Sequence, residues 1–187
     1  MRLGIRATSH EGLAHNGEFA VILINMFEVL VFVYENYWRG EVCPELQQLG
    51  RKLSAHGFDA DEISAALVWL DGLTIAAQSV AAGTEQSPDT FTSQAQSAWS
   101  MRVYSASEQA HLGAEGLGFV MFLESAGVLP AAMREIVIDR AMAVDADPIS
   151  VDELKIIVLM VYWSFGQEPD ALVLDELCDC AEGRLAH

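Results

Sequence analysis

Cysteines are the side chains in this chain best suited to metal or redox chemistry, and two of them, Cys178 and Cys180, are separated by one residue. Their surroundings predict a helix, in which positions two apart point about 200° away from each other. One metal ion could not bind both thiolates without unwinding that helix. Cys43 is distant in sequence, and no histidine stands at ligand spacing, so we predict no metal site and no catalytic nucleophile.

Two glutamates, Glu35 and Glu124, lie within apolar segments that are predicted to be helical. Burial can raise the pKa of a carboxyl group into the range useful for acid–base catalysis. A catalytic pair also needs a cleft and converging polar partners, and the sequence indicates neither. We therefore expect each glutamate at the solvent edge of its helix or paired with an arginine such as Arg134 or Arg140, and we predict no enzyme activity and no cofactor.

The glycine run GAEGLG over residues 113–118 resembles a phosphate-binding loop only superficially. It follows a predicted helix rather than a strand, and it has neither the dinucleotide-binding spacing nor a phosphate-binding lysine. We interpret it as a bend that lets two helices approach closely.

The stretch LSAHGFDADEISAALVWLDGL, residues 53–73, has the form of a helix–turn–helix unit. Its second helix would begin with Asp59, Asp61 and Glu62, which would repel phosphates where a recognition helix meets DNA. The helix dipole explains these acids more simply, because anions stabilise the N-terminal end of a helix. This unit is not expected to read DNA.

The segment SMRVYS, residues 100–105, is the strongest candidate for binding a partner. Arg102 is the first basic residue after Lys52, and it alternates with Met101, Val103 and Tyr104. Arginine and tyrosine are favoured anchors at protein interfaces, so Arg102 and Tyr104 are the predicted partner-binding residues. The alternative is that Arg102 pairs with a local acid such as Glu108 and fixes the segment to the body of the protein.

The charge of the chain restricts its partners. Twenty-seven acids and ten bases give a net charge of −17 over 187 residues. Binding to nucleic acid depends on lysine and arginine neutralising phosphates, so direct binding is not expected. It remains the alternative hypothesis, and would require Arg39, Arg51, Lys52 and Arg102 to cluster. An acidic surface favours basic protein partners instead.

Three scattered cysteines suit a reducing cytoplasm. The apolar run over residues 19–34 is shorter than a spanning helix and is interrupted by Asn25 and Glu28. We expect a soluble, cytoplasmic protein that does not enter a membrane, and both a monomer and a homodimer remain open.

Helical periodicity and capping signals predict an all-α fold. A helix apolar on every side, from Val151 to Phe165, is expected to be the central core helix, with a subunit interface as the alternative. Two degenerate three-helix units are expected to share a core, with a short extended segment after a flexible linker and a C-terminal helix, Ala171 to about Ala181. The predicted organisation is a loose N-terminal extension (1–25), a first helical unit (26–80), the linker (81–99) and a second helical unit with the C-terminal helix (100–187).

The two units look like a degenerate duplication, because VFVYEN (31–36) parallels VMFLES (120–125) and FDADEI (58–63) parallels ISVDEL (149–154). The alternative is that caps and apolar stripes recur in any helical protein.

Several blocks in order, among them MFEVLVFVYENY, HGFDADEISAALVWLDGL, GFVMFLESAGVL and VDELKIIVLMVYWSFG, strongly resemble the Smg family of bacterial proteins. The resemblance covers about residues 26–187 and implies a small, soluble, helical protein with no catalytic motif. It also implies an association with DNA processing, because members are often encoded near a protein that handles incoming single strands. Family members begin at the equivalent of Met26, so residues 1–25 are expected to be an extension. The function we expect is a non-enzymatic acidic adaptor or regulator that binds another protein, in DNA or RNA metabolism.

Overall fold

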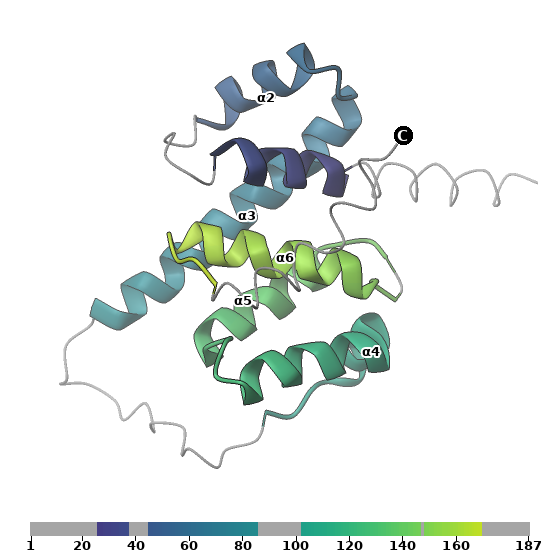
Figure 1. Cartoon of the computed structure of the whole chain (residues 1–187), viewed down its shortest axis with the longest axis vertical. Coiled ribbons are helices and arrows are strands. Elements are labelled where there is room, and N and C mark those ends of the chain that lie inside the picture. Colours follow the sequence, from purple (N-terminus) through teal and green to yellow (C-terminus); the bar gives the residue numbers. More distant parts are fainter. Residues whose placement is uncertain (1–25, 38–44, 86–101, 147, 170–187) are drawn as a thin grey trace, which may run out of the picture.

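The structure is a computed structural model that describes residues 26–37, 45–85, 102–146 and 148–169. The described residues form helices and no strand, which confirms the all-α prediction. The first helix covers residues 26–37. It is followed by α2 (Leu46–Ala55), α3 (Ala60–Glu85), α4 (Ala106–Ser125), α5 (Ala131–Met142) and α6 (Val151–Ser164) (Figure 1).

Helix α6 is the centre of the fold, as its sequence predicts. Every residue from Leu154 to Tyr162 is buried, and the helix packs against α3, α4 and α5. A helix that is apolar on all sides is stable only when other elements surround it. The position of α6 therefore follows from its composition.

A single hydrophobic core joins the two halves of the chain. Phe27 and Leu53 from the first half belong to the same buried cluster as Leu112 and Ile157 from the second. Helix α3 also contacts both α5 and α6. The described helices thus share one core, while their division into two duplicated three-helix units stays a prediction.

Side-chain caps begin three of the helices where the sequence predicts them. Ser105 and Glu108 form a capping box at α4, and Ser150 and Glu153 form one at α6. At α3, the Asp59 side chain accepts a hydrogen bond from a backbone N–H of the first turn, and Glu62 accepts from the backbone N–H of Asp59. These bonds satisfy N–H groups that have no partner within the helix.

The glycine run bends α4, as predicted. Gly113 has φ 65° and ψ 177°, a conformation open in practice only to glycine, and it kinks the helix. One turn later, a Cβ added at Gly116 would lie 3.4 Å from Leu154 Cδ2, so the missing side chain lets α4 approach α6 closely.

Other boundaries differ from the expectation or lie outside the described residues. Helix α3 continues to Glu85, into the first five residues of the expected linker, and the alanines at 81 and 82 favour helix. The structure does not describe residues 86–99, the N-terminal extension or the predicted C-terminal helix. Residues 102–104 are neither helix nor strand, so an extended segment there is not confirmed.

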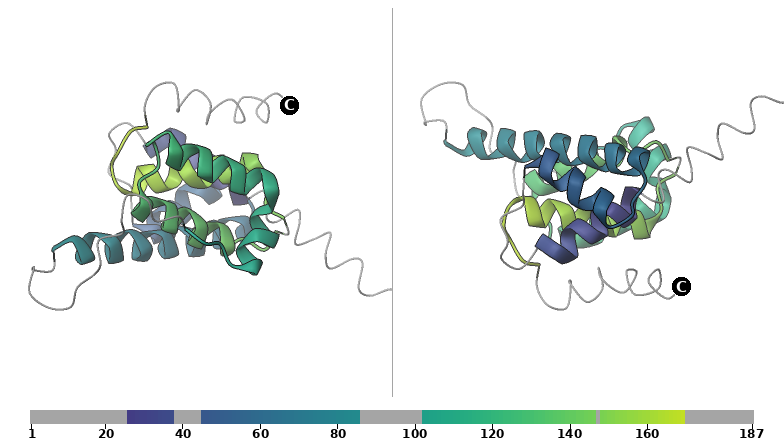
Figure 2. Two further views of the ribbon diagram at one scale, coloured as in Figure 1. Left: turned by 90° about the horizontal axis from the view of Figure 1, so that it is seen from below. Right: turned by 90° about the horizontal axis from the view of Figure 1, so that it is seen from above.

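Helix α3 lies along one side of the molecule (Figure 2). Its buried face is formed by Ile63, Ala66, Leu70, Leu73 and Ala77. Within the described residues, its Ala60–Val80 stretch is long and apolar enough to cross a membrane, although only a third of the most apolar window is buried. Length and composition are weak evidence, because core helices of soluble proteins have the same properties.

Candidate functional site

Arg102 holds two carboxylates from different helices. Its Nη2 donates to Glu108 Oε1 at 2.7 Å and to Glu135 Oε2 at 2.9 Å, and its Nε donates to Glu135 Oε1 at 3.0 Å. Glu108 lies in the first turn of α4, where it also forms the capping box, and Glu135 lies on α5. The arginine therefore fixes the segment before α4 to both helices.

Glu135 extends this network to a buried arginine. Arg134, only 4% exposed, donates to Glu135 Oε1 through Nη2 at 2.7 Å and pairs with Glu124 through Nη1. We call these five residues the arginine network: Arg102, Glu108, Glu124, Arg134 and Glu135. Each arginine faces two carboxylates, and both share Glu135, so three carboxylates surround two guanidinium groups.

The arginine network shifts the pKa of Arg102, Glu108 and Glu135 toward their charged forms. Hydrogen bonds from Arg102 lower the pKa of Glu108 to about 2, and the backbone N–H of Ser105 adds to this effect. Burial opposes ionisation of Glu135, but hydrogen bonds from Arg102 and Arg134 outweigh it and lower the pKa of that carboxyl. Hydrogen bonds to Glu108 and Glu135 in turn raise the pKa of Arg102 above its usual value. Arg102, Glu108 and Glu135 are therefore held in their charged forms, and their ion pairs connect the segment before α4 with α4 and α5.

Tyr104 stacks beneath the arginine network. The Arg102 guanidinium carbon lies 4.4 Å from the centre of the Tyr104 ring, within range of a cation–π contact. The Tyr104 hydroxyl is buried and has no hydrogen-bond partner among the described residues, and burial raises its pKa. The two predicted partner-binding residues are therefore adjacent and partly buried.

The alternative interpretation of Arg102, pairing with Glu108, is confirmed. Partner binding by Arg102 and Tyr104 stays a prediction, and it would require the side chains to leave contacts they already make. Between them, Val103 is 87% exposed and offers an apolar side chain to solvent.

The two glutamates considered for catalysis are not brought together. Glu35 is exposed on the helix over residues 26–37. Glu124 lies on α4, far from that helix in Figure 1, and pairs with Arg134 of α5. Exposure of Glu35 and an ion pair between Glu124 and Arg134 are the placements expected from the sequence. Over the described residues, no group of three histidine, cysteine or acidic side chains could hold a metal ion. Cys43, Cys178 and Cys180 lie outside those residues.

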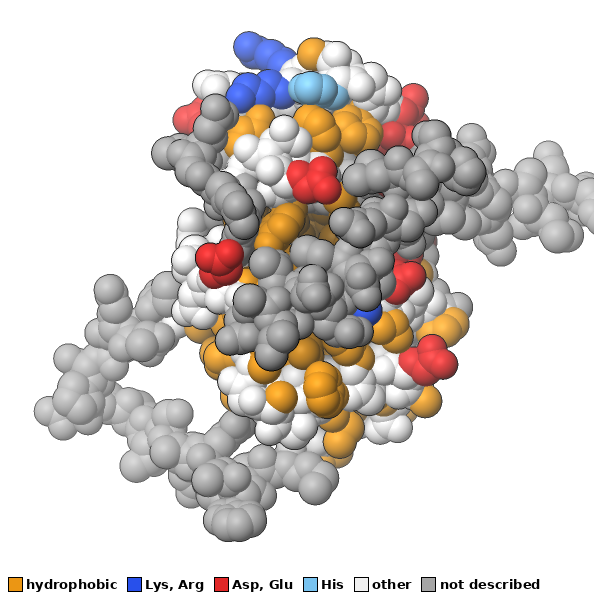
Figure 3. All heavy atoms as spheres, in the orientation of Figure 1, with side chains coloured by type: hydrophobic (Ala, Val, Ile, Leu, Met, Phe, Trp, Pro, Cys, Tyr) orange, Lys and Arg blue, Asp and Glu red, His pale blue; other side chains and the backbone are white. Residues whose placement is uncertain are grey.

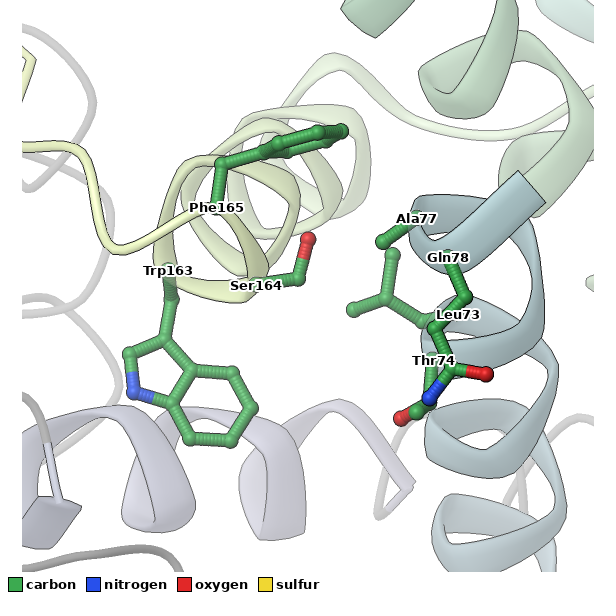
Figure 4. Close-up of a pocket in the computed structure, with 7 residues that line it drawn as sticks. All are labelled: Leu73, Thr74, Ala77, Gln78, Trp163, Ser164 and Phe165. Carbon is green, nitrogen blue, oxygen red and sulfur yellow. The ribbon is translucent and has the colours of Figure 1, made fainter. Parts of the chain in front are cut away.

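A pocket of about 470 Å³ opens between α3 and the end of α6 (Figure 4). The hydroxyl of Thr74 donates to Leu70 O at 3.0 Å and that of Ser164 to Val161 O at 2.7 Å, so both protons are used within their own helices. The pocket therefore suits an apolar group better than a reacting polar substrate. Its lining consists of Leu73, Thr74, Ala77, Gln78, Trp163, Ser164 and Phe165.

Large apolar side chains also lie exposed on two helices. Val68 and Ile75 on α3 are 72% and 58% exposed, and Phe122 on α4 is 62% exposed beside Met121. The sequence pointed to none of these residues. A sequence pattern could have identified the pair on α3, because Val68 and Ile75 are seven residues apart on the face opposite Ile63 and Leu70.

The bases required for nucleic-acid binding do not form one cluster. Arg51 and Lys52 are exposed on α2, where the Lys52 ammonium lies 5.2 Å from the Tyr37 ring centre. Lys and Arg side chains gather at the top of Figure 3, over α2. Arg102 instead belongs to the arginine network beside α4, at the other end of the molecule in Figure 1, and Arg39 lies outside the described residues.

These features define a small acidic helical protein in which Arg102, Arg134 and Arg140 pair with acids of their own chain and some apolar side chains are exposed. The chain belongs to the family described as "Protein of unknown function (DUF494)", whose model matches residues 26–187. This confirms the resemblance to Smg, because the similar curated proteins carry that name.

A protein Smg homolog of Methylibium petroleiphilum is 59% identical to this chain over 162 residues, and one of Leptothrix cholodnii is 58% identical over the same length. A homolog of Herminiimonas arsenicoxydans is 44% identical over 165 residues. Each alignment covers 87% of this chain and the whole of the relative. No solved structure is significantly similar to the chain.

Proposed function

We propose that this protein is a non-enzymatic adaptor or regulator that acts in the cytoplasm by binding another protein with basic surface groups. The observation that carries the proposal is the exposure of Val68 and Ile75 on α3, whose opposite face is already buried in the core. Exposed apolar side chains of this size, rimmed by polar groups, mark protein-interaction surfaces.

Charge indicates the kind of partner. The chain carries −17, and the described arginines Arg102, Arg134 and Arg140 are paired with acids of their own chain. Exposed acids such as Asp71 and Glu115 are left to set the surface potential. Such a surface attracts positively charged proteins and repels nucleic acid.

The pocket between α3 and α6 supports the same function. Interfaces obtain most of their binding energy from a few side chains that enter such pockets. An apolar side chain of the partner would bury itself between Trp163, Phe165 and the α3 residues of the pocket. The association with DNA processing that the resemblance implies makes a basic protein of DNA or RNA metabolism the partner we propose.

The test is to cross-link the chain in its native bacterium, identify the captured protein and measure binding between the two purified proteins. We expect one protein to bind stoichiometrically, with an affinity that falls as salt screens the acidic surface. A gel shift at low salt with single-stranded and duplex nucleic acid is the companion measurement. Tight binding to nucleic acid, or the absence of any stoichiometric protein partner, would overturn the proposal.

A further inference from the structure

The outer side of α3 carries a regular stripe of exposed residues. Their spacing alternates between three and four residues, so they follow one line along the helix for about 25 Å. By helical spacing the line lies opposite the buried face of α3, and α3 itself lies at the edge of the molecule in both views of Figure 2. We call this set the outer stripe: Asp61, Ser64, Val68, Asp71, Ile75 and Gln78, all exposed.

The spacing of the outer stripe matches the seam of a two-helix coiled coil. Val68 and Ile75 occupy equivalent positions seven residues apart and are the β-branched apolar residues that such seams prefer. Together they expose the apolar surface that a partner helix would cover. Surface positions on a soluble helix are otherwise filled by polar residues, so the two side chains need a physical explanation.

Acidic residues in the outer stripe favour a binding partner with positive charge. Asp71 lies between Val68 and Ile75, and its carboxylate has no ion-pair partner among the described residues. Asp61 lies ten residues, about three turns, earlier on the same line. A helix laid along this stripe would be stabilised by lysine or arginine opposite these aspartates, because apposed like charges are unfavourable.

The same charges disfavour a second copy of this chain. Parallel pairing of two outer stripes places Asp71 beside Asp71 of the other copy, and antiparallel pairing about their centre places Asp71 opposite Val68, where no cation compensates its charge. The net charge of −17 on each chain adds to this repulsion. A partner of opposite charge is favoured.

We infer that the outer stripe binds an amphipathic helix of another protein, with apolar residues every three to four positions and lysine or arginine flanking them. The inference rests on the proposed function and specifies its surface and the chemistry of its partner. Helix-in-groove and helix-on-helix recognition both use apolar anchors at this spacing.

The test places a photoreactive phenylalanine analogue at position 68, 75 or 121 of the full chain in the native bacterium. Position 121 is the matched control, because Met121 is 51% exposed on α4, away from the outer stripe. We expect positions 68 and 75 to capture the same protein, through a segment with helical apolar spacing and net positive charge. Asp71→Lys should lower that yield about fivefold or more, and Asp71→Asn should lower it less.

A second variant tests the apolar anchors with the captured protein in purified form. Val68→Ser with Ile75→Ser should weaken binding about 30-fold or more, whereas Met121→Ser with Phe122→Ser should leave it within about twofold. Both double variants change exposed side chains, so each should keep the melting temperature of the parent.

The outcomes separate the two proposals. Capture from position 121 alone, capture of an acidic segment, or an adduct between two copies of this chain would overturn the inference about the outer stripe. A heterologous adduct from position 121 alone would leave the proposed function standing. Failure of all three positions to capture any protein would overturn both.

Discussion

Arg102 shows how one side chain can connect elements that are distant in sequence. Its pairing with Glu108, six residues away, is within reach of sequence reasoning, because the capping position of Glu108 already places it beside the segment. Its pairing with Glu135, 33 residues away, depends on how α5 packs beside α4. Sequence therefore indicated the Arg102–Glu108 pair and named Arg134 as a possible partner of Glu124, and the tertiary structure added Glu135, which joins the two pairs.

The arginine network predicts a pH-dependent contribution to stability. Arg102→Met should lower the free energy of unfolding at pH 7 by about 1–3 kcal/mol, because it removes charge-assisted hydrogen bonds and leaves two carboxylates close together. The pKa of Glu108 is about 2, below its ordinary 4.5. Its ionic stabilisation is therefore present above about pH 4.5 and is lost as the pH falls through about 2.

Urea unfolding of the parent and Arg102→Met at pH 7 and near pH 2 measures this contribution. The difference between the two proteins should shrink at the lower pH. Arg51→Met is the control, since Arg51 is exposed on α2, and it should change stability by less than about 0.5 kcal/mol. A difference for Arg102→Met that is equal at both pH values would contradict the ionic explanation.

At the scale of the element, α4 illustrates local signals that sequence reasoning reads well. Ser105 and Glu108 specify its start, and Gly113 specifies its kink, since the backbone there has positive φ. Helix capping and glycine conformation depend only on neighbouring residues, so they can be predicted from the sequence before the fold is known. The C-terminal end of α3 was harder to place, because its alanines and glycine suit both a helix and a linker.

Two alanine substitutions in α4 should have opposite effects. Gly113→Ala should destabilise the protein by about 1–3 kcal/mol, because alanine is strained at φ 65° and ψ 177°. Gly118→Ala should stabilise it by about 0.5–1 kcal/mol, since an added Cβ meets no atom within 4 Å and alanine favours helix. Thermal unfolding measures both, and a stabilising Gly113→Ala would show that α4 is not kinked there.

At the scale of the whole molecule, charge dominates the behaviour expected in solution. Arg102, Arg134 and Arg140 are paired with acids of the fold, and twenty-seven acids against ten bases leave a large excess of negative charge. A net charge of −17 in a chain of 187 residues opposes compaction through self-repulsion. The same excess gives the outer stripe its expected preference for a basic helix.

Salt should therefore stabilise the folded protein. Raising NaCl from about 20 mM to about 300 mM shortens the Debye length from about 20 Å to about 6 Å and should raise the melting temperature by about 2–5 °C. A variant with Asp61→Asn, Asp71→Asn and Glu115→Gln, all at exposed positions, should show a smaller rise. A melting temperature that falls with salt would mean that ion pairs such as those of Arg102 outweigh the surface repulsion.

The amino-acid sequence by itself determined the helical class, the caps of α3, α4 and α6, the bend at Gly113, the burial of α6 and the family. These properties follow from periodicity, composition and neighbouring residues, which act over a few turns of chain. Only the tertiary structure decided that Arg102 reaches Glu135, that Trp163 and Phe165 enclose a pocket with α3, and that Val68 and Ile75 face solvent. Those outcomes depend on which faces of distant helices meet, and local pattern does not encode the packing of one helix on another.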